Sequence, residues 1–183
     1  MTAIQEEAAE RREFRPLQAE EIARAFNEEN VDYLFIGKSG AILLGYPGTT
    51  QDVDIFPARS PENGRRIVTA LRRTGFEIGS ELEREIVAGK DFVQIKAGPF
   101  DVDLVFAPDG INSYDEAKAR GLTEGIFPVA NLRDIIASKR ASGRQKDTIE
   151  LPLLESFRIE FEKRYPRPLR TSSDIASEKE HRR

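Results

Sequence analysis

Asp52 and Asp54 stand two positions apart in a stretch, Asp52-Val-Asp-Ile-Phe56, that alternates polar and apolar residues. Such alternation predicts a half-buried strand, on which side chains two positions apart point to the same face. Two carboxylates side by side suit a hard divalent cation, because Mg²⁺ takes oxygen ligands and completes its octahedron with water or phosphate oxygens. The pair therefore predicts a metal site made of carboxylates.

A second pair, Asp101 and Asp103, lies in the apolar stretch Phe100 to Phe106, which also predicts a strand. Carboxylates that converge on one site repel each other unless a cation joins them. A solvated strand face is the alternative for each pair alone. Two such pairs favour the metal site.

Gly37-Lys38-Ser39 lies between a strand signal and a short apolar stretch. A P-loop is excluded, because the Walker pattern needs a glycine five positions before Gly37, where Asp32 stands. What remains is a strand that ends in glycine and a helix that begins at a small hydroxyl residue. The amides of such a helix N-terminus suit a triphosphate, to which Ser39 would add a hydroxyl donor and Lys38 a positive charge.

Basic side chains bracket Gly143, which separates two predicted helices. Such a place suits cations that meet a triphosphate, although a solvated helix face is the alternative. Lys139 and Lys146 are the preferred phosphate contacts, and Asp147 is expected to orient one of the cations. The basic residues of this segment are Lys139, Arg140, Arg144 and Lys146.

The composition leaves carboxylates as the plausible metal ligands. The 183 residues contain no cysteine, which excludes thiolate zinc sites and cysteine nucleophiles, and the single histidine, His181, excludes a histidine dyad. The net charge of −4 gives no global signal for nucleic acid or membrane. No stretch is long and apolar enough for a membrane span, and the N-terminus is charged, so we expect a cytoplasmic protein.

The predicted elements alternate between helices and strands, and the segment 77–85 is too mixed to assign. Residues 97–99 look like a hairpin connection between antiparallel strands, and Pro152 should break or kink the last helix. We therefore expect an α/β (α+β) fold with a small mixed sheet flanked by helices, the C-terminal helices closing the cleft. Predicted helices are 17 onward, 39–45, 61–73, 114–120, 131–142 and 146–165; predicted strands are 33–36, 52–56, 91–96 and 100–106, with a brief extended segment at 125–129.

The chain length and hydrophobic content fit one domain. We expect a charged N-terminal arm over residues 1–16, the globular domain over 17–168, and a disordered tail over 169–183. The tail is polar, charged and free of aromatic residues.

Ile36-Gly37-Lys38-Ser39 followed by Asp52-Val53-Asp54 resembles the signature of the nucleotidyltransferases related to DNA polymerase beta. That signature is an apolar residue, Gly-Gly or Gly-Ser, a short gap, then Asp-x-Asp or Asp-x-Glu. Within the superfamily the chain is most similar to the minimal bacterial AbiEii-toxin-type nucleotidyltransferases, over roughly residues 32–155. Thr50, the strand Val102-Asp103-Leu104-Val105 and the segment 130–147 match further family features.

The resemblance implies transfer of a nucleoside monophosphate from a nucleoside triphosphate to an acceptor hydroxyl. It implies Asp52, Asp54 and Asp103 as catalytic ligands of Mg²⁺ or Mn²⁺, with Asp101 as the rival of Asp103. The acceptor stays open among tRNA or other RNA, a protein and a small molecule, and the likeness implies an antitoxin partner. The nucleotide contacts would be Gly37, Lys38, Ser39, Thr50, Lys139 and Lys146.

Two departures from the family pattern leave a second function open. Lys38 replaces the usual second small residue, and Gly48 stands where an arginine is frequent. Both allow a module that binds a nucleotide or a partner without turnover.

Overall fold

The computed structural model describes residues 16–166. The predicted arm and tail lie outside the described residues, apart from Pro16, which begins helix α2 (Pro16–Glu28). Within residues 16–166, no helix is both long and apolar enough to cross a membrane.

A six-stranded sheet forms the centre of the molecule, in the order β3-β4-β2-β1-β6-β5. The neighbours β2 and β4 are parallel, as are β1 and β6, whereas the other three neighbouring pairs are antiparallel. The sheet is therefore mixed, and the predicted α/β fold class is confirmed. The strands are β1 (Tyr33–Phe35), β2 (Asp52–Pro57), β3 (Phe92–Ile95), β4 (Asp101–Val105), β5 (Leu122–Glu124) and β6 (Phe127–Val129).

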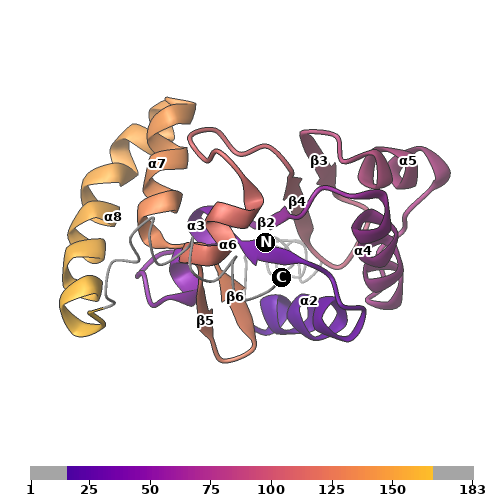
Figure 1. The fold of residues 1–183 in the computed structure, drawn as a ribbon, viewed down its shortest axis with the longest axis horizontal. Helices are drawn as coiled ribbons and strands as arrows, with labels where there is room; N and C mark the ends of the chain where they lie inside the picture. The colour runs from indigo at the N-terminus through magenta and orange to yellow at the C-terminus, as the bar shows by residue number, and fades with distance from the viewer. Residues whose placement is uncertain (1–15, 167–183) are drawn as a thin grey trace, which may run out of the picture.

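Helices flank the sheet, and Figure 1 shows α7 and α8 at one end of the molecule with α4 and α5 at the other. Helix α4 packs against both α2 and α5, while α7 packs against α3 and α8. These helices are α3 (Gly37–Leu43), α4 (Pro61–Arg73), α5 (Ser80–Ala88), α6 (Tyr114–Arg120), α7 (Leu132–Ser142) and α8 (Gln145–Arg164).

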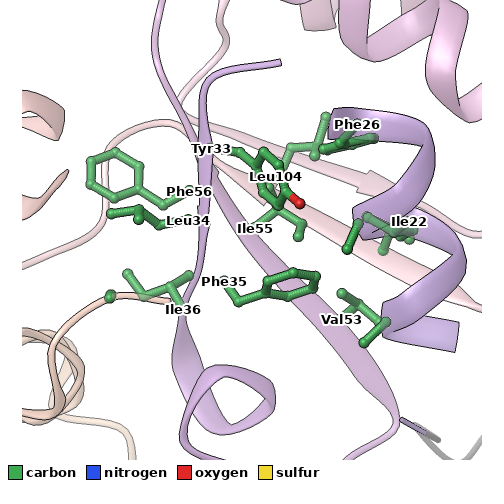
Figure 2. Packing of buried hydrophobic residues seen from close by; sticks show 14 of the residues in the cluster. Ile22, Phe26, Tyr33, Leu34, Phe35, Ile36, Val53, Ile55, Phe56 and Leu104 are labelled. Carbon is green, nitrogen blue, oxygen red and sulfur yellow. The ribbon is translucent and has the colours of Figure 1, made fainter. Parts of the chain in front are cut away.

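One face of the sheet packs against α2. Alternate residues of β1, Tyr33 and Phe35, lie on the side of Ile22 and Phe26 from α2, as Figure 2 shows. All four side chains are at most 4% exposed. Because side chains alternate along a strand, this packing fixes which residues of each strand turn toward the other face.

The opposite face carries the candidate site. Leu34 of β1 and Phe56 of β2 point to this side in Figure 2. The ring of Phe56 meets that of Tyr114 from α6 edge to face, with 5.3 Å between the ring centroids. Asp52 and Asp54 share the face of Phe56 because they lie at alternate positions of β2.

Most predicted elements are present, and the bounds of α4 and α6 match the predicted ones. The predicted hairpin of β3 and β4 is confirmed. Helix α5 was not assigned from sequence, because its N-cap is Gly79, which offers no side-chain cap, and because Ile86 is its one fully buried residue. The extended segment at 125–129 is β6 and the turn at Gly125, and its partner β5 was not predicted.

A break or a kink was expected at Pro152; the break is wrong, because α8 continues through that residue, and the kink stays a prediction. A proline has no N–H to give to the carbonyl group four residues earlier, here that of Thr148. Both Thr148 and Pro152 are exposed, so solvent can hydrate this carbonyl. Leu154 on the other side of the helix is fully buried in the core, which stabilises the continuous helix.

Replacement of Gly64, where α4 packs against α5, should destabilise the protein. A Cβ atom at Gly64 would lie 2.7 Å from the Cα of Val87 and 2.9 Å from the carbonyl oxygen of Ile86, and both are backbone atoms. We expect Gly64→Ala to lower the free energy of unfolding by about 2 kcal/mol, measured in urea. The exposed neighbour Arg65 is the control, and Arg65→Ala should change it by less than about 0.5 kcal/mol. Equal stability of the two variants would contradict this close packing.

Candidate functional site

The parallel pairing of β2 with β4 brings the four aspartates together. Asp52 is the register partner of Asp101, and Asp54 is the partner of Asp103. Register partners point to the same face of a sheet, so the two predicted pairs form one block of carboxylates, which we call the carboxylate cluster. Val53 and Val102 alternate with them and are at most 1% exposed.

Two members of the carboxylate cluster have strongly perturbed acidity. Burial raises the pKa of Asp54 to about 7, and the charges of Asp103 and Asp52 act in the same direction. Burial also raises the pKa of Asp103 to about 6, with the charge of Asp52 as the next cause, and a hydrogen bond from Gln94 opposes the change. Negative charge in this block is therefore incompletely balanced by the protein itself.

Asp103 is the stronger candidate for the third metal ligand. Its side chain is buried, and its Oδ1 has no hydrogen-bond partner among the described residues. Asp101 is only partly buried, and its charge affects the pKa of Asp103 less than that of Asp52 does. A buried carboxylate oxygen without a partner is costly, and a cation would satisfy it.

Gly37 and Ser39 fix the position of Asp54. Gly37 has a φ of +63°, and a Cβ atom there would lie 2.4 Å from Oδ2 of Asp54, so any other residue would be strained and would displace the Asp54 side chain. The hydroxyl group of Ser39 donates to the carbonyl oxygen of Ile36 and accepts from the N–H of Asp54, both at 3.0 Å. Ser39 is fully buried, so its hydroxyl group ties α3 to β2 within the protein.

Two basic residues, Lys139 of α7 and Arg144 at the N-cap of α8, act electrostatically on the carboxylate cluster. The positive charges of Lys139 and Arg144 lower the pKa of Asp54, against the larger effect of burial. Lys139 donates to Oδ1 of Asp147 at 3.0 Å, and Arg144 donates to Oδ2 of the same residue at 2.7 Å. The expectation that Asp147 orients a cation is thus confirmed.

Asp147 is a fixed structural anion. Its side chain is fully buried, which alone would raise its pKa, but hydrogen bonds from Ser142, Arg144 and Lys139 lower the pKa to about 2. Ser142 donates to Oδ2 at 2.7 Å. Asp147 therefore stays ionised and satisfied, and it holds Lys139 and Arg144 beside the turn at Gly143.

Lys38 and Lys139 share one further carboxylate that sequence reasoning missed. Glu150 of α8 accepts from Lys38 through Oε1 and from Lys139 through Oε2, the latter at 3.2 Å. Its spacing from Asp147, three residues on a predicted helix, was the available signal, because such residues share a helix face. Gln94, the register partner of Asp103 on β3, was also missed.

The remaining predicted nucleotide contacts lie at the margin of this arrangement. Thr50 is half-buried, and its hydroxyl group points to the backbone carbonyl oxygen of Asp52 at 3.5 Å. Lys146 is exposed on the first turn of α8, and no contact described for residues 16–166 joins it to the aspartates. Arg144, named among the basic residues but not preferred, acts on Asp54 together with Lys139.

The carboxylate cluster is not a preformed set of metal ligands. Among residues 16–166, no three acidic or histidine side chains are grouped so that they could already hold a metal ion. Like-charged carboxylates are not drawn together without a cation between them, so metal binding here requires side-chain rotation. The unpartnered Oδ1 of Asp103 and the raised pKa of Asp54 fit a divalent cation.

Two hollows of about 310 Å³ each lie away from the aspartates. Leu43 and Glu124 line both of them, between the end of α3 and the β5–β6 hairpin. Phe161 and Tyr165 of the α8 end line the first. The site is therefore defined by charge and register, and these hollows are separate from it.

The fold and site define an α+β protein whose mixed sheet carries a cluster of acidic residues facing basic residues of the C-terminal helices. No model of a known protein family matches the chain, and no curated protein matches it. The function must therefore be argued from the site.

The raised pKa of Asp54 predicts a pH-dependent stability in EDTA. A carboxyl group whose pKa rises from 3.8 to about 7 on folding stabilises the fold while it is protonated, and that contribution is lost as pH rises from about 4 to about 7. Over that range the wild-type free energy of unfolding should fall by about 2 to 4 kcal/mol relative to that of Asp54→Asn. Urea unfolding at several pH values measures this.

Asp109→Asn is the control, because Asp109 is exposed and lies outside the carboxylate cluster. It should follow the wild-type pH profile. Parallel profiles of wild type and Asp54→Asn would contradict the burial of an uncompensated carboxyl group at Asp54.

Proposed function

We propose that this chain is a nucleotidyltransferase of the DNA polymerase beta-like superfamily, dependent on Mg²⁺ or Mn²⁺. It transfers a nucleoside monophosphate from a nucleoside triphosphate to an acceptor hydroxyl group. The observation that carries the proposal is the pairing of Asp52 and Asp54 with Asp101 and Asp103 on parallel strands, with the positive charges of Lys139 and Arg144 acting on Asp54.

The two sets of charges suit the two halves of a metal-bound triphosphate. The carboxylate oxygens of Asp52, Asp54 and Asp103 are the donor type that Mg²⁺ and Mn²⁺ prefer. Lys139 and Arg144, whose charges act on Asp54, could offer N–H donors to phosphate oxygens. A single set of either sign would be an ordinary surface, whereas the opposed sets support a phosphate-transfer site.

The reaction forms one bond and breaks one. The oxygen of the acceptor hydroxyl group bonds to the α-phosphorus, the bond from that phosphorus to the bridging oxygen breaks, and pyrophosphate leaves with the electron pair. Asp103 would accept the hydroxyl proton, because its Oδ1 has no partner and its pKa is raised to about 6. A bound divalent cation would acidify the hydroxyl group and neutralise charge on the leaving group.

A module that binds a nucleotide or a partner without turnover is the second candidate. One observation favours it: the described acidic residues are not grouped as ready metal ligands. Lys38 also forms an ion pair with Glu150, so its charge is already engaged within the protein. Triphosphate binding without pyrophosphate release would identify this second function.

The acceptor stays open among RNA, including tRNA, a protein and a small molecule. The resemblance to AbiEii-toxin-type proteins supports a cytoplasmic toxin with an antitoxin partner as a further reading of the same activity. Growth arrest on expression, relieved by the product of a neighbouring gene, would support that reading.

Transfer of label from α-³²P-labelled triphosphates tests the proposal. With Mg²⁺ or Mn²⁺, and with RNA, protein and small-molecule acceptors assayed separately, we expect label on one acceptor and equimolar pyrophosphate. Asp54→Asn and Asp103→Asn should each lower the rate by about 100-fold or more, because the loss of a metal ligand removes several kcal/mol of transition-state stabilisation.

Asp109→Asn is again the matched control and should keep the wild-type rate. Label transfer that survives unchanged in both Asp54→Asn and Asp103→Asn would overturn the proposal.

A further inference from the structure

Glu150 occupies the space between two lysines of different helices. Its two carboxylate oxygens accept from Lys38 of α3 and from Lys139 of α7. The side chain of Glu150 is 22% exposed, so this bridge is largely, though not completely, shielded from water. Both lysines are among the nucleotide contacts that the family resemblance implies, and Lys139 is also a phosphate contact in the proposed function.

The bridge differs from the neighbouring contact with Asp147. Asp147 is fully buried and receives hydrogen bonds from three side chains, which hold Lys139 in place without Glu150. Lys38 has its described ion pair with Glu150. Hydrogen bonds from Lys38 and Lys139 lower the pKa of Glu150 although burial acts in the opposite direction, so Glu150 is an ionised anion on these lysines.

The local charges explain what the bridge does. Lys38, Lys139 and Arg144 bring three positive charges, and Asp147 and Glu150 bring two negative charges. With Glu150 in place, little positive charge is left for a polyphosphate. If Glu150 turns away, two amino groups become available together at the edge of the carboxylate cluster.

We propose that Glu150 is an internal competitor of the polyphosphate ligand, which must displace the Glu150 carboxylate from Lys38 and Lys139 in order to bind. This inference rests on the proposed function and names the residue that sets the affinity of its phosphate site. Asp147 is not displaced, because its three donors and its burial hold it. Glu150 is thus an affinity-determining residue and not a catalytic one.

Calorimetric titration with inorganic tripolyphosphate tests the exchange without any turnover. Glu150→Gln keeps the size of the side chain and removes its charge, so this variant should bind tripolyphosphate about tenfold more tightly than wild type, since a hydrogen bond to a charged group need no longer be broken. Glu155→Gln is the matched control on the same helix, because Glu155 contacts Arg140 and Arg158 instead. It should bind as wild type does.

The outcomes separate the two proposals. If wild type binds tripolyphosphate and Glu150→Gln binds it with equal or lower affinity, Glu150 only positions the lysines. That result would overturn its role as a competitor and leave the proposed function standing. Tripolyphosphate that binds none of the three proteins contradicts the proposed function and this inference together.

A crystal structure of the wild-type protein with tripolyphosphate decides the same point without a variant. Phosphate oxygens should replace the oxygens of Glu150 at the Nζ atoms of Lys38 and Lys139. A bridge from Glu150 to both lysines that persists beneath bound tripolyphosphate would overturn the exchange.

Discussion

The parallel register of β2 and β4 places like charges at neighbouring positions, and the surrounding structure follows from that constraint. The apolar partners of the same strands, Val53 beside Val102 and Ile55 beside Leu104, are at most 1% exposed and fix this register from the core side. A shift by one residue would bury the aspartates and expose the core. The core therefore stabilises an arrangement of carboxylates that electrostatics alone would disfavour.

The protein offsets this repulsion only in part, from the C-terminal helices. Asp147 fixes Lys139 and Arg144, whose charges act on Asp54, yet burial and the neighbouring aspartates still raise the pKa of Asp54 to about 7. Glu150 forms ion pairs with Lys38 and Lys139, and these occupy lysine amino groups that a phosphate ligand could otherwise bind. The aspartates lack positive charge, which a metal ion would supply. The lysines are paired with Glu150, and their positive charge would suit the phosphate groups of a metal-bound polyphosphate.

Strand alternation was enough to predict that Asp52 and Asp54 share a face, because that period is a property of the backbone. The pairing of Asp54 with Asp103 depends on β2 and β4 being neighbours, which local sequence patterns do not specify. The sequence also could not show that the hydroxyl group of Ser39 joins α3 to β2. This role depends on the burial of Ser39, whose hydroxyl group bonds to the backbone of Ile36 and Asp54. Likewise, the sequence could not tell that the charge of Arg144, and not that of Lys146, acts on Asp54.

The central claim is that the carboxylate cluster is a divalent-cation site, and anomalous diffraction from a crystal soaked in Mn²⁺ tests it most directly. At pH 8, above the raised pKa values of Asp54 and Asp103, both carboxyl groups are ionised and able to turn toward a cation. We expect an anomalous peak about 2.0 to 2.3 Å from oxygens of Asp54, Asp103 and Asp52. A map with Mn²⁺ bound elsewhere, and no peak between these aspartates, would contradict the account.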